Sequence, residues 1–152
     1  MSACRLAREH LPDVAEIERE TFASPWSEGA LELLLSEAAT GAVCLSDGRA
    51  VAYGGMLWAP DEGQITNIAV LKEFRGRGFG DAVLSYLIGE ARERRCVTVS
   101  LEVRESNVAA VSLYEKHGFF VAGKRKRFYT APTEDALIMI LELNYEQEQK
   151  SE

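Results

Sequence analysis

The segment RGRGFG, at residues 75–80, has the residue types and spacing of a phosphate-binding loop. It lies between an apolar, strand-like run at residues 65–71 and a helix-like run that begins near Gly80. A chain that leaves a strand, crosses three alternating glycines and enters a helix turns several backbone N–H groups toward one point. Because such a point suits a pyrophosphate, the loop is a candidate phosphate cradle. A tight strand-to-helix turn without a ligand is the alternative.

Two common nucleotide-binding loops do not fit this segment. The dinucleotide fingerprint places its third glycine three residues after the second, whereas Gly76, Gly78 and Gly80 are evenly spaced. The Walker loop ends in Gly-Lys-Ser/Thr, whereas Gly80 is followed by Asp81. The pattern that remains is Arg/Gln-x-x-Gly-x-Gly, matched by Arg75, Gly78 and Gly80. It resembles the acyl-CoA loop of the GNAT N-acetyltransferases.

Three polar side chains downstream of the loop could act on a bound ligand. Glu102 lies on the polar face of an otherwise hydrophobic strand, near the edge where open α/β sheets bind ligands, so it is a candidate base. Asn107 and Tyr114 are seven residues apart in a predicted helix and return to nearly the same face. Each has a structural alternative: a solvated carboxylate, a helix cap and a core tyrosine, respectively.

Length and charge limit the possible partners. The 152 residues suffice for one domain that buries roughly two-thirds of its unfolded surface. The 24 acidic and 17 basic side chains give a net charge of −7, the opposite of a typical nucleic-acid binder, so we expect no direct nucleic-acid partner. An acidic protein that binds a polyanion needs a local positive site, which Arg75, Arg77 and a helix N-terminus would supply.

Cysteines and histidines give no sign of a metal site or a nucleophilic triad. Cys4, Cys44 and Cys96 are far apart and lack metal-ligand spacing, which predicts free thiols and no metal. His10 and His117 are also distant, without a serine or cysteine nucleophile signature. The N-terminus has no apolar signal core, and no apolar run reaches the ~18 residues that span a bilayer. We therefore expect a cytoplasmic protein without a membrane partner.

The first half of the sequence predicts two helices and three antiparallel strands. The elements are a weak strand at residues 2–7, a helix opened by Pro12, a helix capped by Ser27, and strands at 42–46, 50–58 and 64–71. Asp47-Gly48 is a hairpin signal between the first two of those three strands.

The second half predicts a βαβ unit followed by two closing strands. Apolar residues at helical spacing indicate a helix at residues 80–95, and strict alternation indicates a strand at 97–103 that is parallel to the strand before the loop. The remaining elements are a helix capped by Ser106 or Asn107 that ends at Gly118, strands at 119–129 and 137–143, and a frayed tail. We expect one domain at residues 1–146 and a tail at 147–152.

The loop and the downstream segment together carry a specific resemblance. QITNIAVLKEFRGRGFG at residues 64–80, followed by LEVRESNVAAVSLYEKHGF at residues 101–119, resembles the GNAT family of N-acetyltransferases. Within that family the chain is similar to the RimI branch of ribosomal-protein-alanine N-acetyltransferases, from about residue 3 to about residue 144. The resemblance implies the α/β acyltransferase fold, a mixed sheet of about seven strands flanked by about four helices.

The resemblance also implies where acetyl-CoA would bind. The main chain of Ile68, Ala69 and Val70 would align the pantetheine arm and the acetyl group along a splayed strand edge, and Asn107 would hydrogen-bond the pantetheine. The pyrophosphate would be held by Arg75, Gly76, Arg77, Gly78, Phe79, Gly80 and Asp81. Arg75 and Gly76 depart from the branch, which often has glutamine and a basic residue there.

The same resemblance implies the catalytic groups. Glu102 would take the proton from the incoming amine through water, and Tyr114 would protonate the departing thiolate. Trp26 and Tyr129 would enclose the substrate N-terminus. Phe128 stands where the branch often has a second tyrosine, so one hydroxyl is absent on the substrate side.

The basic run at residues 124–127 has two interpretations. It is typical of a charged strand edge that prevents sheet extension, or it could meet the 3′-phosphate of coenzyme A.

The leading hypothesis is an acetyl-CoA-dependent N-alpha-acetyltransferase that acts on the N-terminal alanine of a small-subunit ribosomal protein by direct transfer. We expect a monomer or weak dimer whose partners are that N-terminal peptide and acetyl-CoA. One alternative is transfer to a lysine or a small amine by the same fold. Another is a non-catalytic acyl-CoA-binding module, in which Glu102→Gln and Tyr114→Phe would leave turnover unaffected.

Overall fold

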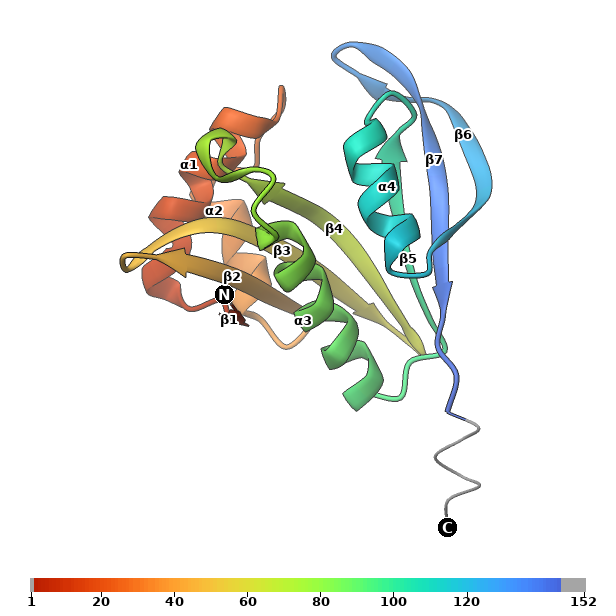
Figure 1. Ribbon diagram of the computed structural model, residues 1–152, viewed down its shortest axis with the longest axis horizontal. Coiled ribbons are helices and arrows are strands. Elements are labelled where there is room, and N and C mark those ends of the chain that lie inside the picture. The colour runs from red at the N-terminus through yellow and green to blue at the C-terminus, as the bar shows by residue number, and fades with distance from the viewer. Residues whose placement is uncertain (1, 146–152) are drawn as a thin grey trace.

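A single mixed sheet of seven strands, in the order β1-β2-β3-β4-β5-β7-β6, runs through the described part of the chain (Figure 1). The computed structural model describes residues 2–145. The strands are β1 (Ala3–Arg5), β2 (Ala39–Ser46), β3 (Arg49–Ala59), β4 (Glu62–Val70), β5 (Thr98–Arg104), β6 (Phe120–Thr130) and β7 (Thr133–Glu142). The α-helices are α1 (Leu11–Thr21), α2 (Glu28–Leu31), α3 (Phe79–Glu93) and α4 (Val108–Lys116), and the 3₁₀ turns are η1 (Arg8–His10), η2 (Glu32–Leu35) and η3 (Lys72–Phe74).

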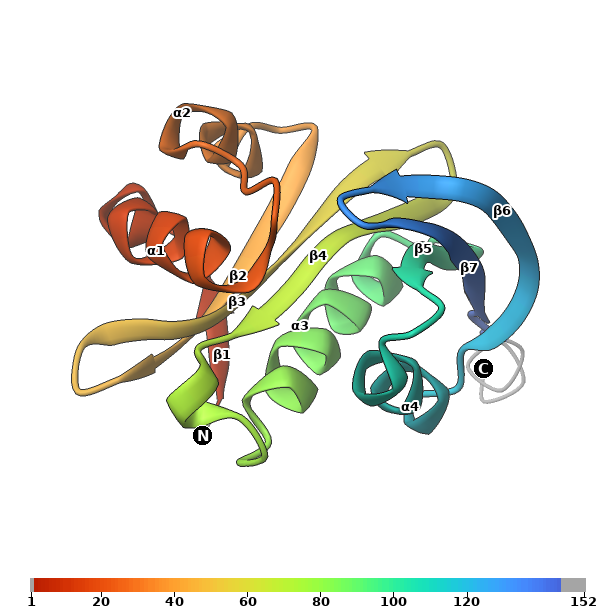
Figure 2. The ribbon, with the colours of Figure 1, turned by 90° about the horizontal axis from the view of Figure 1, so that it is seen from above.

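Helices cover both faces of the N-terminal half of the sheet. Figure 2 shows α1 and α2 on one face and α3 on the other. The apolar side chains at helical spacing point inward, so that Val14 and Ile17 of α1 and Val83 and Leu87 of α3 are fully buried. Burying a side chain of this size contributes about 1.5–3 kcal/mol, which holds the layers together.

The expected antiparallel unit is confirmed, since β2, β3 and β4 pair in that order. The β2–β3 turn places Asp47 at φ 51° and Gly48 at φ 79°. Two consecutive positive φ angles match the twist of a tight hairpin, which explains the Asp-Gly pair.

The sheet opens between β4 and β5, and this is the feature that creates the site. The two strands are parallel, as expected, but pair only over Glu62 to Gln64 and Thr98 to Ser100. Just beyond this pairing, β4 carries a bulge, in which two of its residues, Thr66 and Asn67, lie opposite a single residue of β3, Gly55. A bulge bends its strand and increases the local twist. The two strands therefore diverge toward their carboxyl ends (Figure 1).

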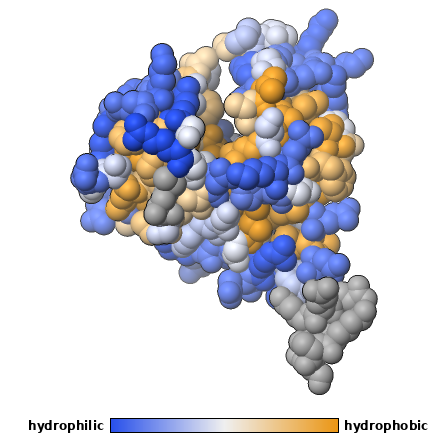
Figure 3. Space-filling view, viewed as in Figure 1, coloured by the Kyte–Doolittle hydropathy of each residue, from blue (hydrophilic) through white to orange (hydrophobic). Residues whose placement is uncertain are grey.

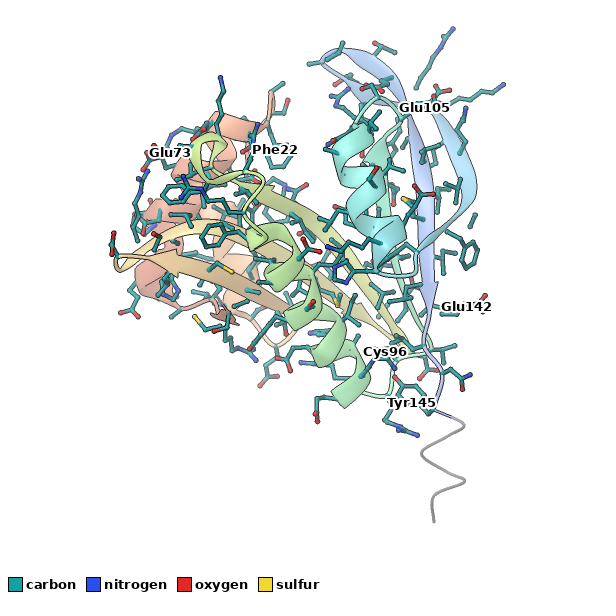
Figure 4. The ribbon with its side chains drawn as sticks, viewed as in Figure 1. Phe22, Glu73, Cys96, Glu105, Glu142 and Tyr145 are labelled. Carbon is teal, nitrogen blue, oxygen red and sulfur yellow. The ribbon has the colours of Figure 1, made fainter. Side chains whose placement is uncertain are left out.

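The closed end of the opening is fixed by hydrogen bonds. The Val97 backbone N–H donates to the Asp61 carbonyl oxygen at 2.7 Å, and Leu143 donates to Val97 at 2.9 Å. The Tyr145 hydroxyl donates to the Cys96 carbonyl oxygen at 2.7 Å, and both residues are labelled near this end in Figure 4. The strands therefore separate from a fixed point.

Several predicted boundaries were wrong by a few residues. The helix after the loop begins at Phe79. It ends at Glu93, because Arg95 adopts φ 57°, which a right-handed helix does not accommodate. The strand predicted at 97–103 is β5, shifted by one residue, and the expected first strand is only Ala3–Arg5. The helix opened by Pro12 ends at Thr21, and Phe22 after it has extended backbone. The predicted tail, residues 147–152, lies outside the described residues.

We predict that Gly54→Ala destabilises the protein. A Cβ at Gly54 would lie 2.6 Å from a Val83 methyl group and 3.1 Å from Leu87, where α3 crosses β3. Overpacking of this kind costs about 1–3 kcal/mol, so the melting temperature should fall. Gly89→Ala on the same helix is the control, because its Cβ would meet nothing within 4 Å, and it should be neutral or stabilising. Equal melting temperatures for the two variants would contradict this packing account.

Candidate active site

A cavity of about 550 Å³ lies in the opening between β4 and β5. Its lining comes from α1 and the segment after it (Thr21, Phe22, Ala23, Ser24, Trp26), from β4 (Ile65, Thr66, Asn67, Ile68), from β5 and α4 (Leu101, Glu102, Val103, Arg104, Asn107, Ala110, Tyr114), and from β6 and the hairpin (Phe128, Tyr129, Thr130, Ala131, Pro132). Figure 3 shows the molecule hollowed between its two halves, and in Figure 4 Phe22 and Glu105 are labelled on opposite sides of the hollow.

A second cavity, of about 660 Å³, continues the first. The two share Trp26, Asn67, Glu102 and Tyr129, and the second extends toward Glu62 and the β7 side. They form one cleft, large enough for an extended ligand rather than a single small molecule.

Glu102 faces both cavities from the middle of β5. Its neighbours Leu101 and Val103 are buried on the other face, as the alternation predicted, while the Glu102 side chain remains 33% exposed. The Arg125 Nε atom lies 3.7 Å from Glu102 Oε2. A partly exposed carboxylate at a cavity wall can reach a ligand directly or through water.

Tyr114 lies on α4 and lines the first cavity. It is 6% exposed, and its ring packs at 5.7 Å from the Phe119 ring. Burial, with a smaller contribution from Tyr129, raises the pKa of the Tyr114 phenol well above its ordinary value of 10. The hydroxyl therefore stays protonated and is available as a donor.

Asn107 caps α4, which is the structural alternative predicted from the sequence. Its side-chain oxygen accepts the Ala110 backbone N–H at 3.1 Å, so Asn107 rather than Ser106 is the N-cap. It also lines the cavity beside Tyr114. Because the oxygen is used by the cap, the amide N–H groups are what Asn107 can offer a ligand.

The open edge of β4 carries the predicted thioester-aligning residues. Ile68, Ala69 and Val70 pair with β3 on one side only, because β5 has already diverged. Ile68 lines the cavity, whereas Ala69 and Val70 lie outside its lining.

The glycine loop has a backbone conformation that suits an anion. Gly76 has φ 76°, and Gly78 has φ 90° and caps α3 without a side-chain bond, conformations that other residues rarely adopt. The free N–H groups and the dipole of the fifteen-residue α3 favour negative charge. Arg75 is held by a 3.0 Å hydrogen bond from its Nε to the Val70 carbonyl oxygen, and Arg77 lies over the Phe74 ring.

Two of the predicted loop residues point away from the cradle. Phe79 is buried and packs edge-on against Phe74. The Asp81 carboxylate is 3.0 Å from both Lys116 Nζ and His117 Nε2, so it joins α3 to α4. Only the main chain of these residues, together with Gly80, is left to serve a phosphate.

The substrate-side residues form two walls. Trp26 follows α1, and its backbone N–H donates to the buried Glu18 carboxylate at 2.7 Å. Tyr129 comes from β6, and its ring lies 4.4 Å from the Arg104 guanidinium. Burial, followed by the negative charge of Glu102, raises the pKa of Tyr129.

The basic run at 124–127 lies on the outer strand β6, on the far side of the molecule from the glycine loop (Figure 2). Lys124 Nζ lies 2.8 Å from Glu105, and the Arg127 backbone N–H donates to Asp135 at 2.9 Å. This placement favours the strand-edge interpretation over a phosphate contact.

The sequence interpretation missed three residues that shape the cleft: Glu18, Asn67 and Arg104. Arg104 donates to the Pro132 carbonyl oxygen at 2.8 Å and pairs with Glu134 at 3.4 Å, which holds the β6–β7 hairpin. Glu18 could have been noticed, because it follows Ile17 on the apolar face of α1, where a carboxylate is unexpected.

Two other features bear on the expected class of site. Within residues 2–145, no group of three or more histidine, cysteine, aspartate or glutamate side chains could hold a metal ion. The described part of the chain also has no helix with the length and apolar character needed to cross a bilayer.

Comparison with known proteins identifies the family. The model of the Acetyltransferase (GNAT) family matches residues 11–119. The chain belongs to this family. A [ribosomal protein bS18]-alanine N-acetyltransferase from Salmonella typhimurium is 38% identical over 141 residues, which cover 91% of this chain and 95% of that protein. The Escherichia coli K12 protein of the same name is 37% identical over 136 residues, covering 88% and 92%.

Solved GNAT structures agree with the observed architecture. The crystal structure of the ribosomal-protein-S18-alanine N-acetyltransferase from Escherichia coli superposes with a TM-score of 0.86 at 35% identity, covering 94% of each chain. A chain in the NatC complex bound to Gag peptide and CoA gives a TM-score of 0.79 at 22% identity, covering 95% of this chain and all of that one. The latter similarity extends to the fold alone. The predicted fold class and family are confirmed.

We predict that Asp81→Asn weakens the α3–α4 connection in a pH-dependent way. Hydrogen bonds from Lys116 and then His117 hold the pKa of Asp81 below its ordinary value of 3.8. A carboxyl group whose pKa is lower in the folded than in the unfolded state stabilises the protein at pH values above its unfolded-state pKa. This contribution disappears as the pH falls through the folded-state pKa.

Urea unfolding of both proteins between about pH 5 and about pH 3 measures this effect. The wild type should be more stable near pH 5, and the difference should shrink toward pH 3. If the difference in the free energy of unfolding between the two proteins is the same at every pH, the ion pair contributes nothing to stability.

Proposed function

We propose that this protein is an acetyl-CoA-dependent N-alpha-acetyltransferase that acetylates the N-terminal alanine of a small-subunit ribosomal protein. The observation that supports it most is that Glu102 and Tyr114 line one cavity at the open edge of β4. Relatives over about nine-tenths of the chain carry the name of this reaction with ribosomal protein bS18.

The chain offers a fitting place for acetyl-CoA. The N–H groups at residues 76–81 suit the pyrophosphate, and the unpaired edge at Ile68 to Val70 suits the amide-containing pantetheine arm. The bound co-substrate supplies an activated acetyl thioester, so no metal or covalent enzyme intermediate is required. A backbone N–H of β4 would stabilise the negative charge that develops on the carbonyl oxygen.

Glu102 serves as the general base. An α-amine has a pKa of about 8, against about 10.4 for lysine, so a carboxylate acting through water suffices to generate the neutral nucleophile near neutral pH. Its position on β5, across the opening from the β4 edge, supports this role, because the peptide N-terminus would enter the same cavity.

Tyr114 serves as the proton donor to the departing thiolate. Its raised pKa keeps the phenol protonated before the reaction. The departing thiolate, whose ordinary pKa is about 8.5, would accept this proton late in the reaction, as the bond from carbon to sulfur breaks.

Trp26 and Tyr129 would enclose the first residue of the peptide from opposite walls. An alanine side chain would fit between these two walls, and the rest of the peptide would continue along the second cavity.

Mass spectrometry tests the proposal directly. The protein is incubated with acetyl-CoA and three acceptors: a peptide that begins with alanine, the same peptide blocked at its α-amine but containing lysine, and a polyamine. We expect acetylation at the α-amine of the first. Product only on lysine or polyamine would assign a different acceptor, and no product from any acceptor would favour a binding module.

We predict that Glu102→Gln lowers kcat by about 10²–10⁴-fold near neutral pH. The loss should shrink as the pH rises above about 8, because the α-amine is then neutral without a base. Steady-state rates from about pH 6 to about pH 10 measure this. Glu105→Gln is the control, since Glu105 is exposed, pairs with Lys124 and does not line the cleft. A loss that is constant with pH would remove Glu102 from the role of base.

A further inference from the structure

Among residues 2–145, one fully buried carboxylate is not used by the proposed chemistry. Glu18 on α1 is fully buried. Its Oε1 accepts the Trp26 backbone N–H at 2.7 Å, while its Oε2 accepts from the Tyr53 hydroxyl and from Asn67 Nδ2 at 3.3 Å. Burying a charge is costly unless hydrogen bonds compensate it. These three bonds span the wall segment, the core of β3 and the β4 bulge, so Glu18 organises one side of the cleft.

The same carboxylate determines how the Asn67 amide is oriented. Glu18 Oε2 accepts the hydrogen bond from Asn67 Nδ2, so the amide nitrogen of Asn67 faces the carboxylate. Tyr53 reinforces this arrangement, because burial, followed by the charge of Glu18, raises the pKa of the Tyr53 phenol and keeps it a donor. With Nδ2 committed to Glu18, Oδ1 is the polar atom that Asn67 can offer the cleft.

Asn67 occupies the place where an acceptor atom would be useful. It lies in the β4 bulge, lines both cavities together with Glu102, and directly precedes Ile68 on the open strand edge. The Ile68 side chain points to the α3 face, close to Val83 and Leu87 at Gly54, whereas Asn67 contacts Glu18 of α1. Asn67 therefore faces the side of the sheet that the peptide would approach.

We propose that Asn67 Oδ1 accepts a hydrogen bond from the α-amine of the acceptor, and that Glu18 is the positioning residue that presents this oxygen. The inference rests on the proposed function. An amine about to attack directs its lone pair at the carbonyl carbon, so its N–H bonds point elsewhere and need acceptors. Glu102 on β5 supplies one acceptor through water, and Asn67 on β4 supplies the other. A neutral amide oxygen orients the amine without trapping its proton.

The decisive experiment measures binding rather than turnover. The protein is saturated with coenzyme A, and calorimetry compares an alanine-starting peptide with its des-amino analogue, in which a propionyl group replaces the alanine. The wild type should prefer the peptide with the amine. Asn67→Ala should lower the affinity for that peptide about tenfold and leave the affinity for the analogue unchanged. An equal loss of affinity for both ligands, or no loss of affinity for either, would overturn the proposal.

Glu18→Gln tests the positioning role. A glutamine can donate as well as accept, so the Asn67 amide is no longer held in one orientation. We expect a higher KM for the peptide with an unchanged KM for acetyl-CoA. Glu16→Gln is the matched control, because it makes the same change on the same helix at an exposed residue that pairs with Arg49. An equal rise of both KM values in Glu18→Gln would indicate general damage and contradict the positioning role.

These outcomes are separable from failure of the proposed function. If the wild type acetylates no α-amine, the proposed function fails. If the wild type acetylates alanine-starting peptides but Asn67→Ala keeps the preference for the amine, only the role of Asn67 fails. Should Glu18→Gln not fold, as thermal unfolding would show, the Asn67→Ala comparison decides alone.

Discussion

The separation of β4 from β5 after three paired residues is the constraint on which the site depends. Within a sheet, a strand edge normally satisfies its N–H and C=O groups by pairing with the next strand. Here the carboxyl half of β4 has a partner on the β3 side only, and the space beside it is the cleft. An extended ligand that carries amide groups can take the place of the missing strand. The bulge at Thr66 and Asn67 therefore creates both the cleft and a backbone surface able to bind along it.

A cleft produced by strand divergence has to be kept open and in shape, and charged groups act on three sides. Glu18 joins the wall after α1 to the bulge, and Arg104 joins the β6–β7 hairpin to β5. Asp81 joins α3 to α4 below the glycine loop. Each of these groups bonds segments that are distant in sequence, so each fixes the relative position of two elements rather than the form of one. Glu102 and Tyr114 can then stay in place although β4 and β5 do not pair beside them.

Local patterns predicted most of the elements, because the spacing of apolar residues along a strand or helix follows from which of its faces is buried. The alternation around Glu102, the Asp47-Gly48 turn and the cap at Asn107 are of this kind. The missing information was tertiary. Nothing local indicates that β4 and β5 separate, that Asp81 turns toward α4, or that Glu18 is buried among donors from three segments. The roles of the glycine loop and of the other site residues came from family resemblance rather than from periodicity, and they remain predictions.

A crystal structure of the complex with acetyl-CoA would test the central claim most directly. We expect a thioester lying along Ile68 to Val70 with its carbonyl oxygen bonded to a β4 N–H, the pyrophosphate on the N–H groups of residues 76–81, and β4 and β5 still apart. A coenzyme bound elsewhere on the surface, or β5 paired with β4 along its whole length, would contradict it.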